Sequence, residues 1–140
     1  MGAAASGRVA RRRAAARSRQ VLSRVYHLAA RADWDAARDA GAYRAASLDT
    51  EGFIHCSTAT QVAGVANAFY RGRRDLVLLE IDPARLRSAL QFESPAHPTG
   101  ASDAPSDERF PHVYGPIDLD AVVAATDFAP GADGRFVFAG

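Results

Sequence analysis

The chain has 140 residues, of which 48% are hydrophobic and 24% are charged, and its formal net charge is +1. This length and composition are typical of one globular domain with a buried core. No apolar run comes near the ~18 residues of a membrane-spanning helix, and there is only one cysteine. We therefore expect a cytoplasmic protein with no membrane partner and no internal disulfide.

The charged residues are distributed unevenly between two segments of the chain. Residues 1–24 contain seven arginines and no acidic residue, whereas the rest of the chain has ten arginines and sixteen acidic residues, a formal charge of −6. We expect residues 1–24 to form a disordered Arg/Ala-rich arm and residues 25–140 to form the single domain. Because proteins bind nucleic acid mainly through Lys and Arg contacts to phosphate, the acidic domain argues against a nucleic-acid partner.

The domain opens with a predicted strand and a predicted helix. The apolar run VYHL, residues 25–28, is typical of a strand, and its alternation places His27 on the same face as Val25. Asp33 is in position to cap the start of the helix, and Gly41 is in position to end it.

The stretch FIHCS, residues 53–57, is the second predicted strand, and an extended piece at 43–46 and a turn at 49–52 precede it. Alternation places Phe53, His55 and Ser57 on one face of this strand. An aromatic ring, an imidazole and a hydroxyl on one face form either an ordinary edge surface or the wall of a site. These two interpretations remain open at this point.

The later elements alternate between helices and strands. Thr58 and Gln61 form a capping box for a helix whose apolar residues recur at helical spacing up to Phe69. LVLLEI, residues 76–81, is expected to be a central strand buried on both faces. The remaining elements are, in chain order, a short helix opened by Asp82 and Pro83, a strand at 90–93, a Pro- and Ser-rich loop at 94–109, the strand FPHVY at 110–114, a short helix at 118–123, and strands at 123–128 and 134–138. Without a regular βαβ rhythm, they predict an α+β fold with largely antiparallel sheets and a few short helices.

The strand FPHVY repeats the pattern of the earlier strand. Its alternation places Phe110, His112 and Tyr114 on one face, again an aromatic ring, an imidazole and a hydroxyl. A single strand histidine is more often a structural residue whose nitrogens are satisfied than a catalyst. The two matching faces together with His27 favour a functional site as much as the structural explanation, and both interpretations remain open.

A metal site is the other histidine-based alternative. His27, His55 and His112 together with Glu93 could surround an ion, but the chain contains no H-x-H, H-E-x-x-H or C-x-x-C motif. Cys56 faces away from its neighbour His55 on the strand, so we interpret it as a core residue. Glu93 lies where a strand meets the long loop, which suits a functional carboxylate and a solvated strand end equally well.

Four segments together resemble one protein family, a small bacterial family known as domain of unknown function 952. These segments are YHL, EGFIHCSTATQVAGVANAFY, LVLLEID and FPHVYGPIDLDAVV, and the resemblance covers about residues 25–138. The family is similar in fold to the ADP-ribosyltransferases. In those enzymes a first-strand histidine holds the nicotinamide ribose, a second strand places side chains against the nicotinamide, and a later acidic residue orients the ribose.

The resemblance implies a role for each candidate residue. His27 matches the first-strand histidine, His55 and Ser57 match the second-strand wall, and Glu93 is a candidate for the acidic residue. The expected function is binding of NAD, as a substrate, or of a related nucleotide in a cleft lined by histidine and aromatic residues, with transfer of a ribosyl group. The catalytic candidates are His27, His55 and Glu93, and the nucleotide-binding candidates are Phe53, Ser57, Phe110, His112 and Tyr114. The alternatives are a non-catalytic module that binds a small ligand and the histidine-based metal site.

Overall fold

The structure is a computed structural model that describes residues 23–95 and 108–138. Nearly all of the predicted arm, and most of the predicted loop at 94–109, lie outside the described residues. The described elements are, in chain order, β1 (Val25–Ala30), α2 (Arg31–Ala40), β2 (Ala42–Tyr43), α3 (Ala46–Thr50), β3 (Ile54–His55), α4 (Val62–Phe69), β4 (Leu76–Ile81), the 3-10 turn Pro83–Arg85, β5 (Ala89–Glu93), β6 (Phe110–Tyr114), β7 (Ile117–Asp118), the 3-10 turn Leu119–Ala121 and β8 (Val122–Phe128).

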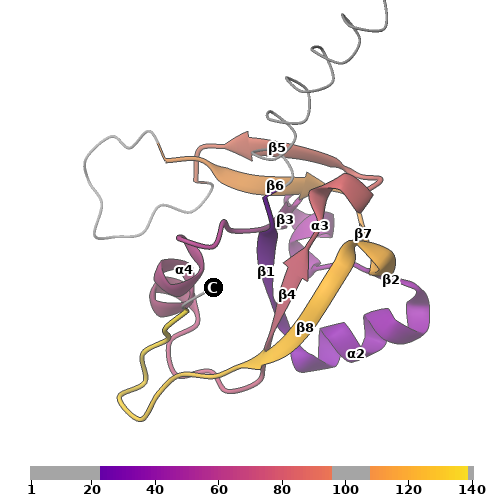
Figure 1. Cartoon of the computed structure of the whole chain (residues 1–140). Coiled ribbons are helices and arrows are strands. Elements are labelled where there is room, and N and C mark those ends of the chain that lie inside the picture. Colours follow the sequence, from indigo (N-terminus) through magenta and orange to yellow (C-terminus); the bar gives the residue numbers. More distant parts are fainter. Residues whose placement is uncertain (1–22, 96–107, 139–140) are drawn as a thin grey trace, which may run out of the picture.

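Three small antiparallel sheets organise the domain. Sheet A has the strand order β1-β4-β8, sheet B pairs β2 with β7, and sheet C has the order β3-β6-β5. Figure 1 shows sheet A through the middle of the domain, with β5 and β6 crossing beyond one end of it. The architecture confirms the predicted α+β class with antiparallel sheets and few helices.

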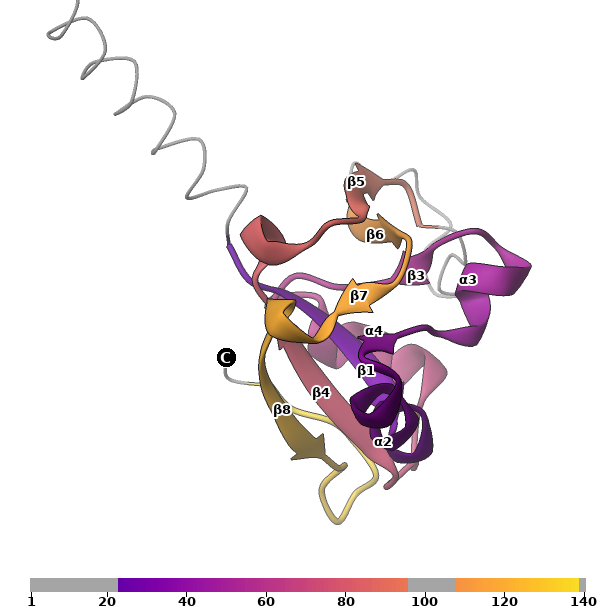
Figure 2. The same ribbon diagram turned by 90° about the vertical axis from the view of Figure 1, so that its right-hand side faces the viewer.

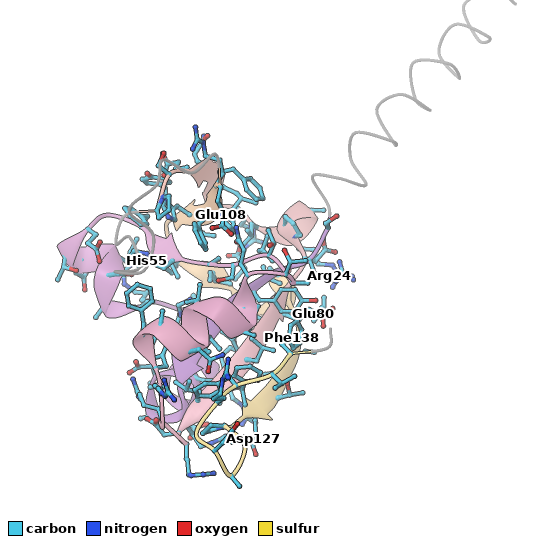
Figure 3. All side chains as sticks on the ribbon, turned by 90° about the vertical axis from the view of Figure 1, so that its left-hand side faces the viewer. Arg24, His55, Glu80, Glu108, Asp127 and Phe138 are labelled. Atoms are coloured by element: carbon cyan, nitrogen blue, oxygen red, sulfur yellow. The ribbon has the colours of Figure 1, made fainter. Side chains whose placement is uncertain are left out.

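Strand β4 is the buried centre of sheet A. Its run of apolar residues alternates between two cores: Leu79 and its neighbours on one face, and Leu78 with Leu76 on the other. Helix α2 contributes Ala37 to the first core, and α4 contributes Val62 to the second. The helices therefore cover opposite faces of sheet A, with α2 nearest the viewer in Figure 2 and α4 nearest in Figure 3. The prediction of a central strand buried on both faces is confirmed.

Sheet C is joined to sheet A through the end of β3. Ser57 forms an isolated bridge with Tyr26 of β1, in which each backbone N–H donates to the other carbonyl at 2.7 Å. Ile54 and Val113 are directly opposite each other in β3 and β6, and both are fully buried in the core that Leu79 occupies. The residues that alternate with them therefore lie on the outward face of sheet C.

Several predicted boundaries were wrong. Helix α2 begins at Arg31 without a side-chain cap, so Asp33 lies inside the first turn and does not cap it. At the other end Gly41 adopts φ +90°, and its N–H donates to the carbonyl of Ala37, so the predicted helix end is confirmed. The strand predicted at 53–57 has regular pairing only at Ile54 and His55.

Helix α3 lies between the predicted extended piece, of which Tyr43 is in β2 and Ala45 is extended, and the predicted turn, of which it takes the first two residues. Leu48 packs against the core, and Ser47 Oγ donates to the carbonyl of Phe53 at 2.8 Å, so tertiary contacts favour a helical turn here. Residues 134–138 lie within the described part of the chain and do not form the predicted strand. Phe136 instead binds α4, because its N–H donates to the Asn67 side chain at 2.7 Å and its carbonyl accepts from the same amide at 3.0 Å.

No helix among residues 23–95 and 108–138 has the length and apolar character needed to cross a membrane.

Candidate functional site

The two predicted histidine strands pair with each other in sheet C. His55 of β3 lies directly opposite His112 of β6, and β5 completes the sheet on the other side of β6. The side chains that gather on the outward face are called the sheet C cluster: Phe53, His55, Glu93, His112 and Tyr114. Figure 3 labels His55 in the upper half of the view and Asp127 near the bottom.

Phe53 is the aromatic centre of the sheet C cluster. Its ring stacks on the His112 ring with centroids 4.2 Å apart and an interplanar angle of 23°. The His55 and Tyr114 rings contact it at centroid distances of 4.9 Å and 5.4 Å. The two imidazole centroids are 5.6 Å apart, in an edge-to-face arrangement. Stacked and edge-to-face contacts of this kind hold the rings in fixed relative positions.

Glu93 joins two members of the cluster by hydrogen bonds. Its Oε1 accepts from Tyr114 OH at 2.6 Å and from His112 Nδ1 at 2.8 Å. These two donors, Tyr114 first, lower the pKa of Glu93 below its ordinary value, and the bond to the carboxylate raises the pKa of Tyr114. Glu93 is thus an ionised carboxylate at neutral pH, and its side chain is 40% exposed.

His55 has a carboxylate partner of its own. Its Nε2 lies 3.1 Å from Oε2 of Glu51, which follows α3, and the two side chains are 35% and 30% exposed. The outward face of sheet C therefore carries two neighbouring histidine–carboxylate pairs. Such a pair can hold an imidazole in a fixed orientation and exchange protons with a bound molecule.

His27 does not join this face. It is 7% exposed and lies under β3, where its Nδ1 donates to the His55 carbonyl at 2.5 Å and its Nε2 accepts from Tyr43 OH at 2.8 Å. Burial lowers the pKa of His27 to about 4 and raises the pKa of Tyr43 above its ordinary value. His27 is thus a neutral residue that fixes the backbone of β3 directly beneath His55.

Two other predicted residues lie at the margins of the cluster. Ser57 is buried at the bridge to β1, one residue beyond Cys56, whose N–H still donates to the Pro111 carbonyl of β6 at 3.0 Å. Phe110 is half-buried opposite Glu93, at the far end of β6 from Tyr114. The expectation that Ser57 shares a face with Phe53 and His55 stays a prediction.

Sequence reasoning missed two residues beside the cluster. Gln91 lies directly opposite His112 in β5 and is exposed. The alternation of Gln91 with Glu93 in the predicted strand was a usable signal. Glu51 was a less readable case, since the turn that brings its carboxylate to His55 is specified by the packing of α3 and not by a local motif.

The metal alternative has no support in the part of the chain that the structure describes, where no group of three or more His, Cys, Asp or Glu side chains is arranged to hold an ion. His27 and His55 share only a backbone contact. Cys56 is buried in the core, as predicted, and burial raises its pKa above the ordinary value, so it is an unreactive thiol.

The fold and the cluster define an α+β domain with a histidine- and aromatic-lined sheet face. The family model described as "Protein of unknown function (DUF952)" matches residues 28–125, so this chain belongs to the DUF952 family. The matched segment contains the whole sheet C cluster and starts one residue after His27. The resemblance to that family is confirmed.

Solved structures of one bacterial protein are similar to this chain. The crystal structure of protein CC0527 from Caulobacter crescentus is 31% identical, covers 81% of this chain and 93% of that one, and has a TM-score of 0.69. The solution NMR structure of CC0527 is 29% identical, covers 81% of this chain and 91% of that one, and has a TM-score of 0.61. None of the curated proteins matches this chain.

Proposed function

We propose that the outward face of sheet C binds NAD, or a related nucleotide, and cleaves its nicotinamide–ribose bond in the manner of an ADP-ribosyltransferase. The observation that carries the proposal is the position of an ionised, half-exposed carboxylate, Glu93, beside an aromatic and imidazole surface. Cleavage of a glycosidic C–N bond builds up positive charge on the ribose, and a fixed carboxylate stabilises that charge.

The aromatic members of the cluster suit a nicotinamide ring. Phe53 is half-buried and Tyr114 is exposed, so both offer ring surface to a flat ligand. Base–aromatic stacking contributes about 1–3 kcal/mol. Phe110, at the Glu93 end of β6, is the third ring available to the same ligand.

The imidazoles suit sugar hydroxyls. His55 and Glu51 are paired and are 35% and 30% exposed, so the pair presents an imidazole and a carboxylate together to the hydroxyls of a ribose. We assign His27 a positioning role in this function, since it holds the His55 carbonyl and has no ring nitrogen left for a ligand. Ser57 is buried, and its backbone bridge to Tyr26 joins β3 to β1, so we assign it a positioning role as well.

A second candidate is a ligand-binding module without turnover. It is favoured by the two hydrogen bonds that Glu93 already accepts, which reduce the charge that this carboxylate can offer to a reacting ribose. Both candidates place the nucleotide on the same residues. They differ only in whether the bond to nicotinamide is broken.

Calorimetric titration with NAD, combined with chromatographic detection of released nicotinamide, tests both candidates. Phe53→Ala should weaken binding roughly fivefold or more, since it removes the central stacking ring. Phe69→Ala is the matched control, an exposed phenylalanine on α4 outside the cluster, and should leave the affinity unchanged. Binding with release of nicotinamide supports the transferase, binding without release supports the module, and equal affinity in wild type and Phe53→Ala contradicts both.

A further inference from the structure

The Glu93–His112 pair fixes which nitrogen of His112 carries a proton. Glu93 is ionised, and an ionised carboxylate can only accept hydrogen bonds, so the proton of the 2.8 Å bond belongs to His112 Nδ1. In a neutral imidazole the other nitrogen, Nε2, is then a hydrogen-bond acceptor. Within the described residues no hydrogen bond reaches Nε2 of His112, and since no fully buried side-chain nitrogen there lacks a partner, Nε2 is in contact with solvent.

The surroundings of His112 keep the ring in this orientation. Phe53 stacks on one face, Tyr114 shares the Glu93 oxygen, and the whole residue is only 2% exposed. A histidine held by a carboxylate through Nδ1, with Nε2 as an acceptor, is the arrangement that general-base catalysis requires. At 2% exposure only a small molecule can reach Nε2.

We propose that His112 is the general base of the proposed reaction and that its acceptor is a small hydroxyl compound, water above all, so that the domain hydrolyses the nicotinamide–ribose bond. This inference rests on the proposed function. The C–N bond breaks and its electron pair leaves with nicotinamide. The acceptor oxygen bonds to the same ribose carbon, and its proton passes to His112 Nε2 while Nδ1–H remains bonded to Glu93.

The burial of His112 excludes large acceptors. Because only 2% of His112 is exposed, a hydroxyl on a folded protein or a nucleic acid cannot approach Nε2 without rearrangement of the cluster, whereas water or methanol can. A carboxylate acceptor has no proton to lose at neutral pH and would need no base. The titratable groups that face His112 are Glu93 from β5, Tyr114 from β6 and His55 from β3, with Glu51 acting on His55.

The tautomer can be read directly by NMR of the ¹⁵N-labelled protein through long-range couplings in the imidazole rings. The wild type should show His112 protonated at Nδ1 at neutral pH, and Glu93→Ala should lose this preference. Glu80→Ala is the matched control, because Glu80 is a strand carboxylate of similar exposure (36% against 40%) that pairs with Arg24 and not with a histidine. A wild-type His112 protonated at Nε2 overturns the inference, whether or not NAD binds.

The second experiment measures the reaction of NAD, with methanol present as a competing acceptor. His112→Gln should reduce nicotinamide release about 100-fold or more while changing the NAD dissociation constant far less. Methanol should yield the methyl glycoside beside ADP-ribose, and a serine-containing protein should yield no adduct.

The two experiments distinguish the general-base role of His112 from the proposed function. An undiminished rate in His112→Gln, or a protein adduct in place of hydrolysis, overturns the role of His112 and leaves the proposed function standing. No NAD binding by the wild type overturns the proposed function, and the tautomer measurement then still decides whether His112 is oriented as a base.

Discussion

Sheets A and C are both three-stranded and antiparallel, but they place their histidines in opposite situations. His27 in sheet A uses both ring nitrogens on the protein itself and has a pKa lowered to about 4 by burial. His112 in sheet C uses one nitrogen on an ionised carboxylate and leaves the other as an acceptor. Strand alternation alone does not distinguish these cases. The difference comes from what lies on each face: among the described residues, hydrophobic cores pack on both sides of sheet A, whereas the second face of sheet C carries the polar and aromatic cluster.

The largest expected effect is on the stability of sheet A. Leu79→Ala removes a fully buried side chain from the central strand and should lower the free energy of unfolding by about 2–5 kcal/mol. Phe92→Ala, in sheet C, removes a ring that is 47% exposed and should cost far less. Urea unfolding of both variants measures the contrast, and equal losses would mean that the two sheets do not differ in packing as described.

The second prediction concerns the pH dependence that His27 imposes. In the unfolded chain His27 binds a proton near its ordinary pKa of about 6.5, but in the folded domain only near its pKa of about 4. Stability from this residue is therefore fully present above pH 6.5 and is lost as the pH falls towards 4. The loss amounts to about 3 kcal/mol.

The variant His27→Gln isolates this effect, because glutamine can hydrogen-bond without titrating in this range. The stability difference between pH 7 and pH 4.5 should be smaller in His27→Gln than in the wild type. Unfolding curves at several pH values provide the measurement. Identical pH profiles for the two proteins would show that His27 is not buried as a neutral residue.

The smallest effect is the one that concerns function. His55→Ala should reduce NAD affinity by about 0.5–1.5 kcal/mol, up to roughly tenfold, because one hydrogen bond to a sugar hydroxyl is lost. Its stability should change little, since the side chain is 35% exposed. The melting temperature and the calorimetric affinity, measured together, check this. A large fall in melting temperature with unchanged affinity would make His55 a structural residue.

Much of sheet A was readable from the sequence. The run LVLLEI has the continuous apolar character that only a strand covered on both faces needs, and Gly41 ends its helix because a left-handed conformation is required there. Asp33 was misassigned because α2 starts directly from β1, where the N–H of Arg31 donates to the Asp75 carbonyl at 2.7 Å and no side chain caps the helix. Tertiary contacts thus decided the boundaries that local signals left open.

The sequence predicted the two strand faces of the candidate site separately, but not that they form one surface. Alternation predicted that His112 and Tyr114 share a face and that Phe53 and His55 share another, but not that these faces would be one. That pairing depends on Ile54 meeting Val113 in the core, a contact between segments far apart in the chain. Sequence patterns of period two do not carry such information.

The central claim is that a nucleotide binds on the outward face of sheet C, and backbone amide chemical shifts measured during a titration with NAD test it most directly. The account predicts that the perturbed amides gather in β3, β5 and β6, around His55, Gln91 and His112, while those of β8 remain unchanged. Perturbations centred on β8 or α2, or no perturbation at millimolar NAD, would contradict it.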